Sequence, residues 1–130
     1  MAQWIKTEFG SIALLSNHDP FPKTDQALIE PNGLIAISKT LEAKKIIEAY
    51  KQGIFPWFNE HEPILWWSPD PRLILFPEDL IISSSLSKKI RKNNYRFLID
   101  NDFSSIIKHC SEIKRKGQDG TWIDDRIINA

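Results

Sequence analysis

Closely spaced prolines are the feature that most constrains this 130-residue chain, because five of its eight prolines stand at positions 56, 63, 69, 71 and 77. A proline fixes its own φ angle, lacks an amide donor and biases the preceding residue toward extended backbone. The segment from residue 54 to 71 therefore cannot form a regular helix. Three of the five tryptophans, Trp57, Trp66 and Trp67, lie in the same segment. We predict a stiff, extended path that presents large aromatic rings.

These aromatic rings have two competing interpretations. Rings on a proline-stiffened backbone suit stacking on a nucleobase or contact with an apolar side chain. The alternative is that the rings form a core that joins two subdomains, since most tryptophans in proteins are packing residues. The residue pattern by itself favours packing and leaves the binding surface open as the other interpretation.

Composition places the chain among globular proteins and excludes several classes of function. Hydrophobic residues make up 42% of it and charged residues 26%, which argues against wholesale disorder. The 17 basic and 17 acidic side chains balance, so any contact with nucleic acid must come from a local patch. A single cysteine excludes an internal disulfide framework and a multi-cysteine zinc site.

The sequence shows no targeting or membrane signal. It has neither a signal-type apolar stretch near the N-terminus nor an apolar run long enough to cross a bilayer. We therefore expect a cytoplasmic protein without membrane contact. The length allows one ordinary domain or two small ones.

An irregular segment, a strand and a helix are predicted before the aromatic centre. Residues 17–32 are rich in Pro, Asp and Asn, which is typical of an irregular surface segment. The apolar run 33–37 suits a buried strand. A helix is predicted over residues 41–52, with Thr40 as its N-cap and Gly53 as its left-handed C-terminal stop. Its apolar face comprises Ala43, Ile46, Ile47 and Tyr50.

Strands and a short basic helix are predicted after the aromatic centre. Apolar runs at residues 73–76, 80–82 and 95–99 suit strands. Ser85 is expected to cap a basic helix that ends at Lys92.

Two helices are predicted in the last third of the chain. The first covers residues 102–114, and its apolar face comprises Phe103, Ile106, Ile107, Cys110 and Ile113. After a polar loop at residues 115–120, Thr121 and Asp124 have the spacing of a capping box. The helix that they open has Ile123, Ile127 and Ala130 on one face. Because the sequence stops about two turns into this helix without a stop signal, we expect the protein to continue beyond Ala130.

The densest positive cluster of the chain lies on the predicted basic helix. Lys88, Arg91 and Lys92 are spaced i, i+3 and i+4, which places them on one helix face. That arrangement suits contact with a phosphate backbone. The alternative is an ordinary solvated face, and the pattern leaves both interpretations open.

The sequence has no clear catalytic or metal-binding group. His61 has no second histidine at ligand spacing, so we expect no metal site. Cys110 is predicted to be a buried, inert thiol. Asp124 and Asp125 are interpreted as charges at a helix N-terminus rather than an acid–base pair. Since no Gly-rich phosphate loop or Ser-His-Asp set occurs, we expect a binding surface without an evident catalytic group or cofactor.

Several motifs, in order over almost the whole chain, resemble the N-terminal half of bacterial leucyl/phenylalanyl-tRNA–protein transferases. The tryptophan–proline stretch is the most specific of them. The matching motifs are Glu30-Pro31-Asn32-Gly33-Leu34, Ala49-Tyr50, Gly53-Ile54-Phe55-Pro56-Trp57-Phe58, Pro63-Ile64-Leu65-Trp66-Trp67-Ser68-Pro69-Asp70-Pro71-Arg72, Cys110 and Gly120-Thr121-Trp122-Ile123.

The resemblance implies an α+β protein of two domains. Residues 1–70 would form a small N-terminal α/β domain, and residues 71–130 the first part of a GNAT acyltransferase-like domain. The implied reaction transfers Leu or Phe from Leu-tRNA or Phe-tRNA to an acceptor protein whose N-terminal residue is Lys or Arg, which marks it for degradation by the N-end rule. A monomer without cofactor or metal is expected.

The resemblance also assigns roles to residues of this chain. Tyr50, Trp57 and Trp122 stand where the family binds the 3′-terminal adenosine and the aminoacyl side chain. Lys88, Arg91 and Lys92 fall where the family contacts the tRNA acceptor stem. The family's catalytic glutamate and its later Asp and Gln lie beyond Ala130, so this chain would have no catalytic residue and be inactive alone.

Two other classes of function compete with the transferase. The first is a naturally short, non-catalytic module that binds tRNA or a nucleotide. The second is a carbohydrate- or peptide-binding domain that uses the tryptophans, which would explain neither the basic helix nor the ordered motifs. Salt separates the transferase and the tRNA-binding module from the carbohydrate- or peptide-binding domain, because tRNA binding weakens steeply as salt rises and stacking on a sugar does not.

Overall fold

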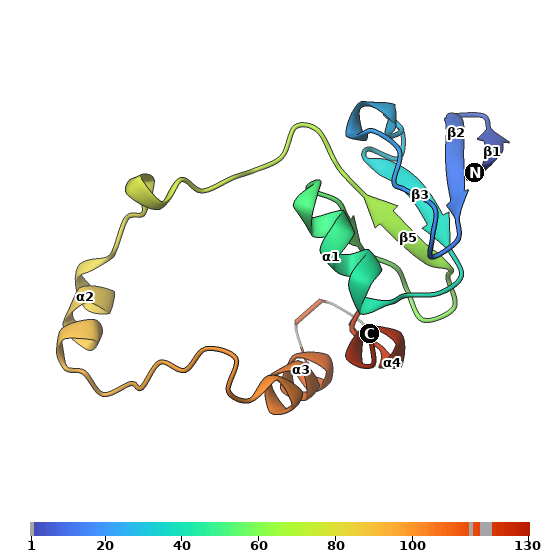
Figure 1. The fold of residues 1–130 in the computed structure, drawn as a ribbon. Coiled ribbons are helices and arrows are strands. Elements are labelled where there is room, and N and C mark those ends of the chain that lie inside the picture. Colours follow the sequence, from blue (N-terminus) through green and yellow to red (C-terminus); the bar gives the residue numbers. More distant parts are fainter. Residues whose placement is uncertain (1, 115, 118–120) are drawn as a thin grey trace.

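A five-stranded sheet organises the first half of the chain in the computed structural model, which describes residues 2–114, 116–117 and 121–130 (Figure 1). The strand order is β1-β2-β3-β5-β4. All neighbouring strands are antiparallel except β2 and β3, which are parallel. The strands are β1 (Gln3–Thr7), β2 (Gly10–Leu15), β3 (Leu34–Ser38), β4 (Phe55–Pro56) and β5 (Ile64–Trp67).

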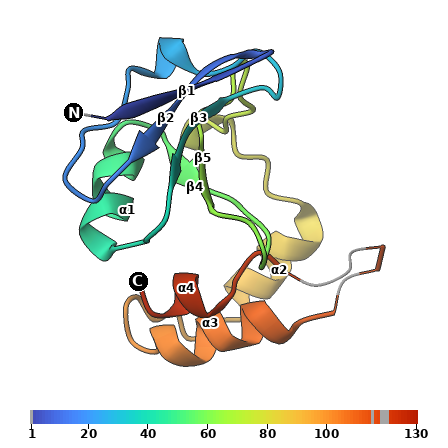
Figure 2. The ribbon, with the colours of Figure 1, turned by 90° about the vertical axis from the view of Figure 1, so that its right-hand side faces the viewer.

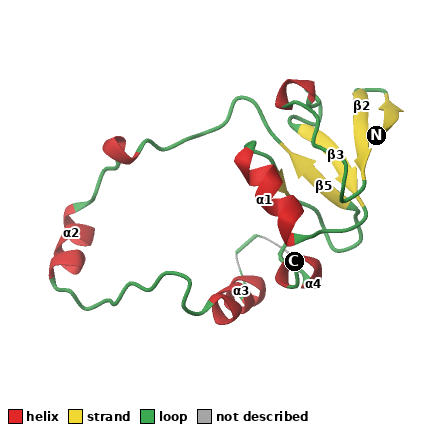
Figure 3. Cartoon of the chain, viewed as in Figure 1, coloured by secondary structure: helices red, strands yellow, loops and turns green. Residues whose placement is uncertain are grey.

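The helices complete a mixed α/β architecture (Figure 3). They are α1 (Ala43–Lys51), α2 (Ser84–Arg91), α3 (Phe103–Glu112) and α4 (Asp125–Ile128), with 3₁₀ turns at Thr24–Gln26 and Pro77–Asp79. Helix α1 lies against one face of the sheet (Figures 1 and 2). After β5 the chain leaves the sheet along an extended path to α2 and α3. In the part of the chain that is described, no helix has the length and apolar character needed to span a membrane.

The core lies between the sheet and α1 and is centred on Trp66, which is 0% exposed. The Trp66 indole N–H donates to Ser38 Oγ at 2.9 Å. The Phe21 ring packs edge-on against the Trp66 ring, with 4.9 Å between the two ring centroids. A buried indole needs an acceptor for its one polar atom, and Ser38 at the end of β3 provides it. Ser38 is the last residue of β3, which confirms the strand predicted at residues 33–37 with a shift of one residue.

Helix α1 is present, but the predicted apolar face and N-cap are wrong. Ile47 and Tyr50 are exposed, whereas Lys45 is only 3% exposed and Ala49 is fully buried. The Lys45 ammonium donates to the backbone carbonyl of Asp19 and to the Glu48 carboxylate, and it lies 4.2 Å from the Phe21 ring centroid. Because a lysine stem is apolar and its ammonium finds these partners, the lysine side of the helix can face the core.

The N-cap of α1 is Glu42, since the Thr40 hydroxyl donates to Asn17 Oδ1 at 2.7 Å instead of capping the helix. The predicted stop at Gly53 is confirmed, with a φ of +72°. The Gly53 amide donates to the Tyr50 carbonyl and the Ile54 amide to the Ala49 carbonyl. This pair of hydrogen bonds is a Schellman motif, and it turns the chain so that Ile54 enters the core.

The three strands predicted at residues 73–76, 80–82 and 95–99 are absent from the structure. Their apolar side chains are exposed, and Leu73 is 100% exposed. A strand needs a neighbour that pairs with its backbone groups, and within the described residues none pairs with these runs. Helices α2 and α3 form in the same region because a helix satisfies its own backbone hydrogen bonds.

Helices α2, α3 and α4 correct several predicted details. Ser83 rather than Ser85 caps α2, by accepting from the Leu86 amide at 3.3 Å. Helix α3 is confirmed, but the face containing Phe103 and Ile106 is exposed, and Cys110 is half-buried.

At α4 the N-cap is Asp124 instead of Thr121. Its side chain accepts from the amides of Arg126 and Ile127, so the predicted capping box is absent and the predicted helix N-terminal role of Asp124 is confirmed. The Thr121 hydroxyl instead accepts from the Ile123 amide at 3.2 Å. Residues 115 and 118–120, part of the predicted loop, lie outside the described residues, as does Gly120 of the quoted motif.

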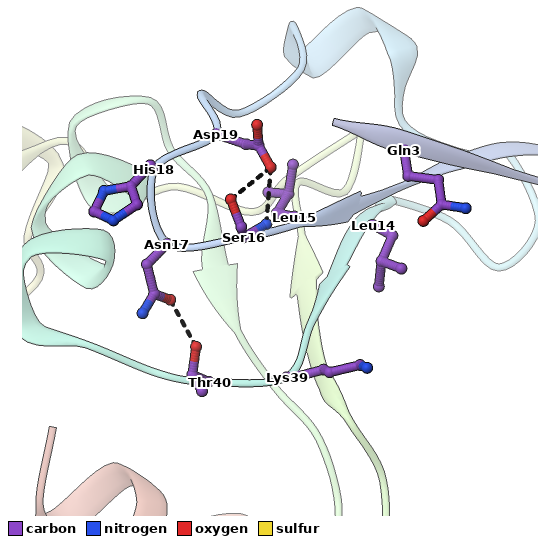
Figure 4. A pocket seen from close by; sticks show the side chains of 9 residues that line it. All are labelled: Gln3, Leu14, Leu15, Ser16, Asn17, His18, Asp19, Lys39 and Thr40. Atoms are coloured by element: carbon purple, nitrogen blue, oxygen red, sulfur yellow. Dashed lines mark hydrogen bonds between the residues drawn. The ribbon is translucent and has the colours of Figure 1, made fainter. Parts of the chain in front are cut away.

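The loop after β2 is fixed to α1 through the Asp19 carbonyl, which accepts from Lys45, and it is closed by the Asp19 carboxylate, which binds Ser16 (Figure 4). The Ser16 backbone N–H and hydroxyl donate to Asp19 Oδ2 at 2.9 and 2.7 Å. First the backbone hydrogen bond and then the hydroxyl lower the pKa of Asp19 from its ordinary value of 3.8 to about 2. Since the Asp19 carbonyl accepts from Lys45, this turn holds the acceptor of the buried ammonium in place.

We predict that the Asp19 turn makes stability depend on pH in acid. A carboxyl whose pKa is lower in the folded than in the unfolded chain stabilises the fold fully above about pH 4, and this contribution is lost as the pH falls through about 2. Ser16→Ala removes the hydroxyl donor, so the pKa of Asp19 measured by carboxyl NMR titration should rise toward 3.8. Ser111→Ala on α3 is the control and should leave that titration unchanged. An unchanged Asp19 titration in a folded Ser16→Ala chain would contradict the prediction.

Candidate functional site

The β4–β5 hairpin divides the aromatic residues between two faces. Phe55 pairs with Trp67 and Pro56 with Trp66, and the Trp57 amide donates to the Leu65 carbonyl at 3.0 Å. Because successive side chains of a strand point to opposite faces, the residues divide strictly by position. The inward set is Ile54, Pro56, Phe58, Ile64 and Trp66, and the outward set is Phe55, Trp57, Leu65 and Trp67.

The outward set forms one wall of a cavity of about 460 Å³, and Phe58 of the inward set also lines this cavity. Trp57 is 58% exposed, so this residue is accessible to a ligand. The Trp67 indole N–H donates to the Trp57 carbonyl at 2.7 Å, which fixes the orientation of the Trp67 ring. An apolar wall with a free aromatic face suits a flat base or an apolar side chain.

Polar groups form the rim of this cavity. Glu62 Oε2 accepts from the Asn59 amide at 2.8 Å and from Asn59 Nδ2 at 3.0 Å. On another side, Asn32 Nδ2 donates to the Asp70 carbonyl at 3.0 Å and its Oδ1 accepts from the Asp70 amide. Asn32, Asn59 and Glu62 all line the cavity, so the apolar wall is bordered by oriented hydrogen-bonding groups.

Gly33 and Arg72 hold the ends of the hairpin in place. A Cβ at Gly33, whose φ is +90°, would lie 2.4 Å from backbone atoms of Pro69, so only glycine allows this close approach. It brings Pro69, which lines the cavity, against the turn before β3. Arg72 Nη2 donates to the Gly53 carbonyl at 2.7 Å, and its guanidinium lies 5.3 Å from the Phe55 ring centroid.

The structure gathers only one of the three predicted aminoacyl-adenosine residues at the cavity. Trp57 lines it. Tyr50, in the last turn of α1, is 59% exposed, and Trp122, before α4, is half-buried. Neither Tyr50 nor Trp122 is among the described residues that line the cavity. The binding roles of all three stay predictions.

The three predicted tRNA contacts share one helix, as their spacing indicated. Lys88, Arg91 and Lys92 are exposed at the C-terminal end of α2, where Lys92 is the C-cap. Helix α2 lies at the far side of the extended path from the hairpin (Figure 1). The structure therefore keeps the basic cluster away from the Trp57 cavity, and the role of the cluster also stays a prediction.

Sequence reasoning missed Asn59 and Glu62, which line the cavity, and Arg126, which contacts their loop. Arg126 Nη1 donates to the Glu62 carbonyl at 2.7 Å, and its Nη2 donates to the carbonyls of Asn59 and Glu60 at 3.0 and 3.1 Å. The guanidinium also lies 4.4 Å from the Phe58 ring centroid. For Arg126 the one available signal was an arginine two residues after an aspartate at a predicted helix start.

Asp124 forms an ion pair with this arginine, and its pKa is lowered. Arg126 Nε and Nη2 donate to Asp124 Oδ2 at 2.8 and 2.5 Å. Partial burial raises the pKa of Asp124, but the hydrogen bonds and positive charge of Arg126 outweigh it and hold the pKa below its ordinary value. Asp124 is therefore held ionised as the partner of Arg126.

A second, more polar cavity of about 550 Å³ lies at the other end of the sheet and includes Ser16, Asn17, Asp19 and Thr40 (Figure 4). These four side chains hydrogen-bond to one another in pairs, Ser16 with Asp19 and Thr40 with Asn17. The first pair closes the turn after β2, and the second joins that turn to the segment before α1. Over the described ranges, no set of three or more His, Cys, Asp or Glu side chains is arranged to hold a metal ion.

Comparison with known proteins gives consistent matches over most of the chain. Residues 39–70 match the family model of the leucyl/phenylalanyl-tRNA protein transferase N-terminal domain, and residues 74–130 match that of leucyl/phenylalanyl-tRNA protein transferase. The first stretch covers the hairpin and most of the cavity wall.

Curated relatives named leucyl/phenylalanyl-tRNA–protein transferase agree. The protein from Nitrosospira multiformis is 49% identical over 119 residues, which are 92% of this chain and 51% of the relative. The one from Nitrosomonas europaea is 50% identical over 119 residues, 92% of this chain and 50% of the relative. The one from Shewanella loihica is 49% identical over 116 residues, which are 88% of this chain and 49% of the relative. The chain thus spans about half the length of these relatives, and it belongs to the leucyl/phenylalanyl-tRNA–protein transferase family.

Proposed function

We propose that this chain provides the aminoacyl-adenosine and tRNA-binding part of an aminoacyltransferase. The enzyme would move Leu or Phe from its aminoacyl-tRNA to the N-terminal Lys or Arg of an acceptor protein, which marks that protein for degradation by the N-end rule. The observation that carries the proposal is the Trp57 cavity, in which an exposed indole adjoins Phe55 and Trp67 on an apolar wall. Family membership supplies the reaction.

The cavity suits the chemistry of this substrate. Transfer is the attack of an α-amine on an aminoacyl ester, and it requires positioning, amine deprotonation and stabilisation of an oxyanion. The indole face of Trp57 would stack on the adenine, and the apolar wall would accept Leu or Phe while rejecting charged side chains. Tyr50 and Trp122 would complete the site. We assign no cofactor, no metal and no catalytic residue to this chain.

The second half of the chain would belong to a larger domain. We propose that residues 1–70 form the N-terminal α/β domain and residues 71–130 the first part of a GNAT acyltransferase-like domain. The two family matches adjoin between residues 70 and 74, which supports that boundary. The exposed apolar side chains between Leu73 and Ile113 suit burial in such a domain. We propose a cytoplasmic location, because aminoacyl-tRNA is made in the cytoplasm, and we expect a monomer.

We predict that the 130-residue chain alone does not transfer an amino acid. The chain spans about half of its relatives, and the family resemblance puts the catalytic glutamate in the other half. The test measures transfer of Leu from Leu-tRNA to a peptide that begins with Arg. The full-length Nitrosospira multiformis relative is the positive control. Peptide labelling by this chain above a protein-free reaction would overturn the prediction.

We predict that Trp57→Ala weakens binding of an aminoacyl-adenosine. Loss of one stacked ring should cost about 1–3 kcal/mol of binding free energy. The probe is 3′-deoxy-3′-(leucylamido)adenosine, whose amide resists hydrolysis, and calorimetry gives its affinity. Trp4→Ala, which removes a partly exposed indole from β1, is the matched control and should bind like the unmodified chain. Equal affinity in a folded Trp57→Ala chain would show that this ring does not stack.

We predict that neutralising the basic cluster flattens the salt dependence of tRNA binding. Each lost phosphate contact should reduce the slope of log affinity against log salt by about 1. The variant replaces Lys88, Arg91 and Lys92 by Gln, and filter binding measures tRNA affinity at several salt concentrations. The control replaces the exposed Lys6, Lys23 and Lys39 by Gln, which removes the same charge elsewhere. Equal slopes in the two triple variants would leave the cluster as a solvated face.

A further inference from the structure

The loop between β4 and β5, residues 59–62, contributes two of the polar residues that line the Trp57 cavity. Residues Asn59, Glu60 and His61 are exposed. Within the loop, the Glu62 amide donates to the Asn59 carbonyl at 3.0 Å and the Asn59 amide donates to Glu62 Oε2 at 2.8 Å. Asn59 and Glu62 both line the Trp57 cavity, so any movement of this loop moves the rim.

Arg126 holds the loop from a segment more than 60 positions away in the sequence. The sequence separations of its three carbonyl contacts are 64, 67 and 66 residues. One planar guanidinium therefore binds the carbonyls of Glu62, Asn59 and Glu60 at once. A guanidinium can do this because its donors form a fixed fork, whereas an ammonium has no such geometry.

Two further contacts fix the direction of the guanidinium. Asp124 binds it at 2.8 and 2.5 Å, and the same carboxylate accepts from the Arg126 amide at 2.9 Å, so backbone and side chain of the arginine are held by one group. On the other side the guanidinium lies 4.4 Å from the centroid of the Phe58 ring, which is only 2% exposed. Phe58 itself lines the Trp57 cavity, so the arginine is anchored against the cavity lining.

We propose that Arg126 is a positioning residue for the Trp57 cavity, because it holds the 59–62 loop in the conformation that places Asn59 and Glu62 on the rim. Release of the arginine would leave the loop sampling conformations with a distorted rim. Ligand affinity would then fall in proportion to the share of molecules that keep the binding conformation. The identity of the ligand rests on the proposed function, whereas the restraint of the loop does not.

The experiment compares Arg126→Ala and Arg126→Lys with the unmodified 130-residue chain. Hydrogen exchange of the Asn59 and Glu62 amides reports the loop, and amides of β3 and β5 report the sheet. We expect Arg126→Ala to raise loop exchange and to weaken 3′-deoxy-3′-(leucylamido)adenosine binding, each about tenfold, with sheet exchange unchanged. Arg126→Lys should give loop exchange and affinity between those of Arg126→Ala and the unmodified chain, since lysine keeps the charge and loses the forked donors. Arg126→Lys carries the same test if Arg126→Ala does not fold.

Two further variants sharpen the interpretation. Arg96→Ala removes an exposed arginine from the extended path and should match the unmodified chain in both measurements. Asp124→Asn keeps an acceptor for the Arg126 amide but removes the charge that orients the guanidinium, so it should raise loop exchange by less than Arg126→Ala.

The outcomes separate this proposal from the proposed function. Loop exchange equal to that of Arg96→Ala would overturn it, as would a uniform rise of exchange in loop and sheet, which would show a merely stabilising role. If the unmodified chain does not bind the adenosine analogue, the proposed function fails. The exchange measurement on Arg126→Ala then still decides whether the arginine restrains the loop.

Discussion

Burial of Trp66 is the interaction on which the rest of the structure depends. Its ring is enclosed between the sheet and α1, meets Phe21 edge-on and has its one polar atom satisfied by Ser38. So large an apolar surface with a single donor has few stable positions. A slip of one residue in the β4–β5 pairing would turn this ring to the opposite face and leave its place in the core empty. The register of the hairpin is thereby determined.

That register decides which aromatic residues meet solvent. With Trp66 inside, alternation turns Trp67 outward and, across the pair, Phe55 and Trp57 as well. Phe58 then points inward, where its ring lies beside the Arg126 guanidinium. The two interpretations of the aromatic centre therefore both apply, one to each face. The same strand pairing that closes the core builds the wall of the candidate site.

The second half of the chain shows what happens where such pairing is missing. Its apolar runs have strand-like composition, yet they lie in the extended path with exposed side chains. Helices α2 and α3 form in the same region because each helix bonds its own backbone, whereas a strand depends on a neighbour. Which elements form here thus depends on whether their backbone hydrogen bonds are local or long-range in the sequence. Local ones suffice for helices, and the longer-range ones that strands need are absent among the described residues.

The sequence by itself determined the features that depend on local backbone preferences. These are the absence of helix between residues 54 and 71, the strand at Leu34–Ser38 and the stop of α1 at Gly53. It also singled out the aromatic motif that contains the cavity wall. Only the tertiary structure decided that Lys45 faces the core and that Arg126 holds the cavity rim. Each of those positions depends on carbonyls and rings that distant segments bring into reach, and a pattern of hydrophobic and charged residues along one segment carries no information about them.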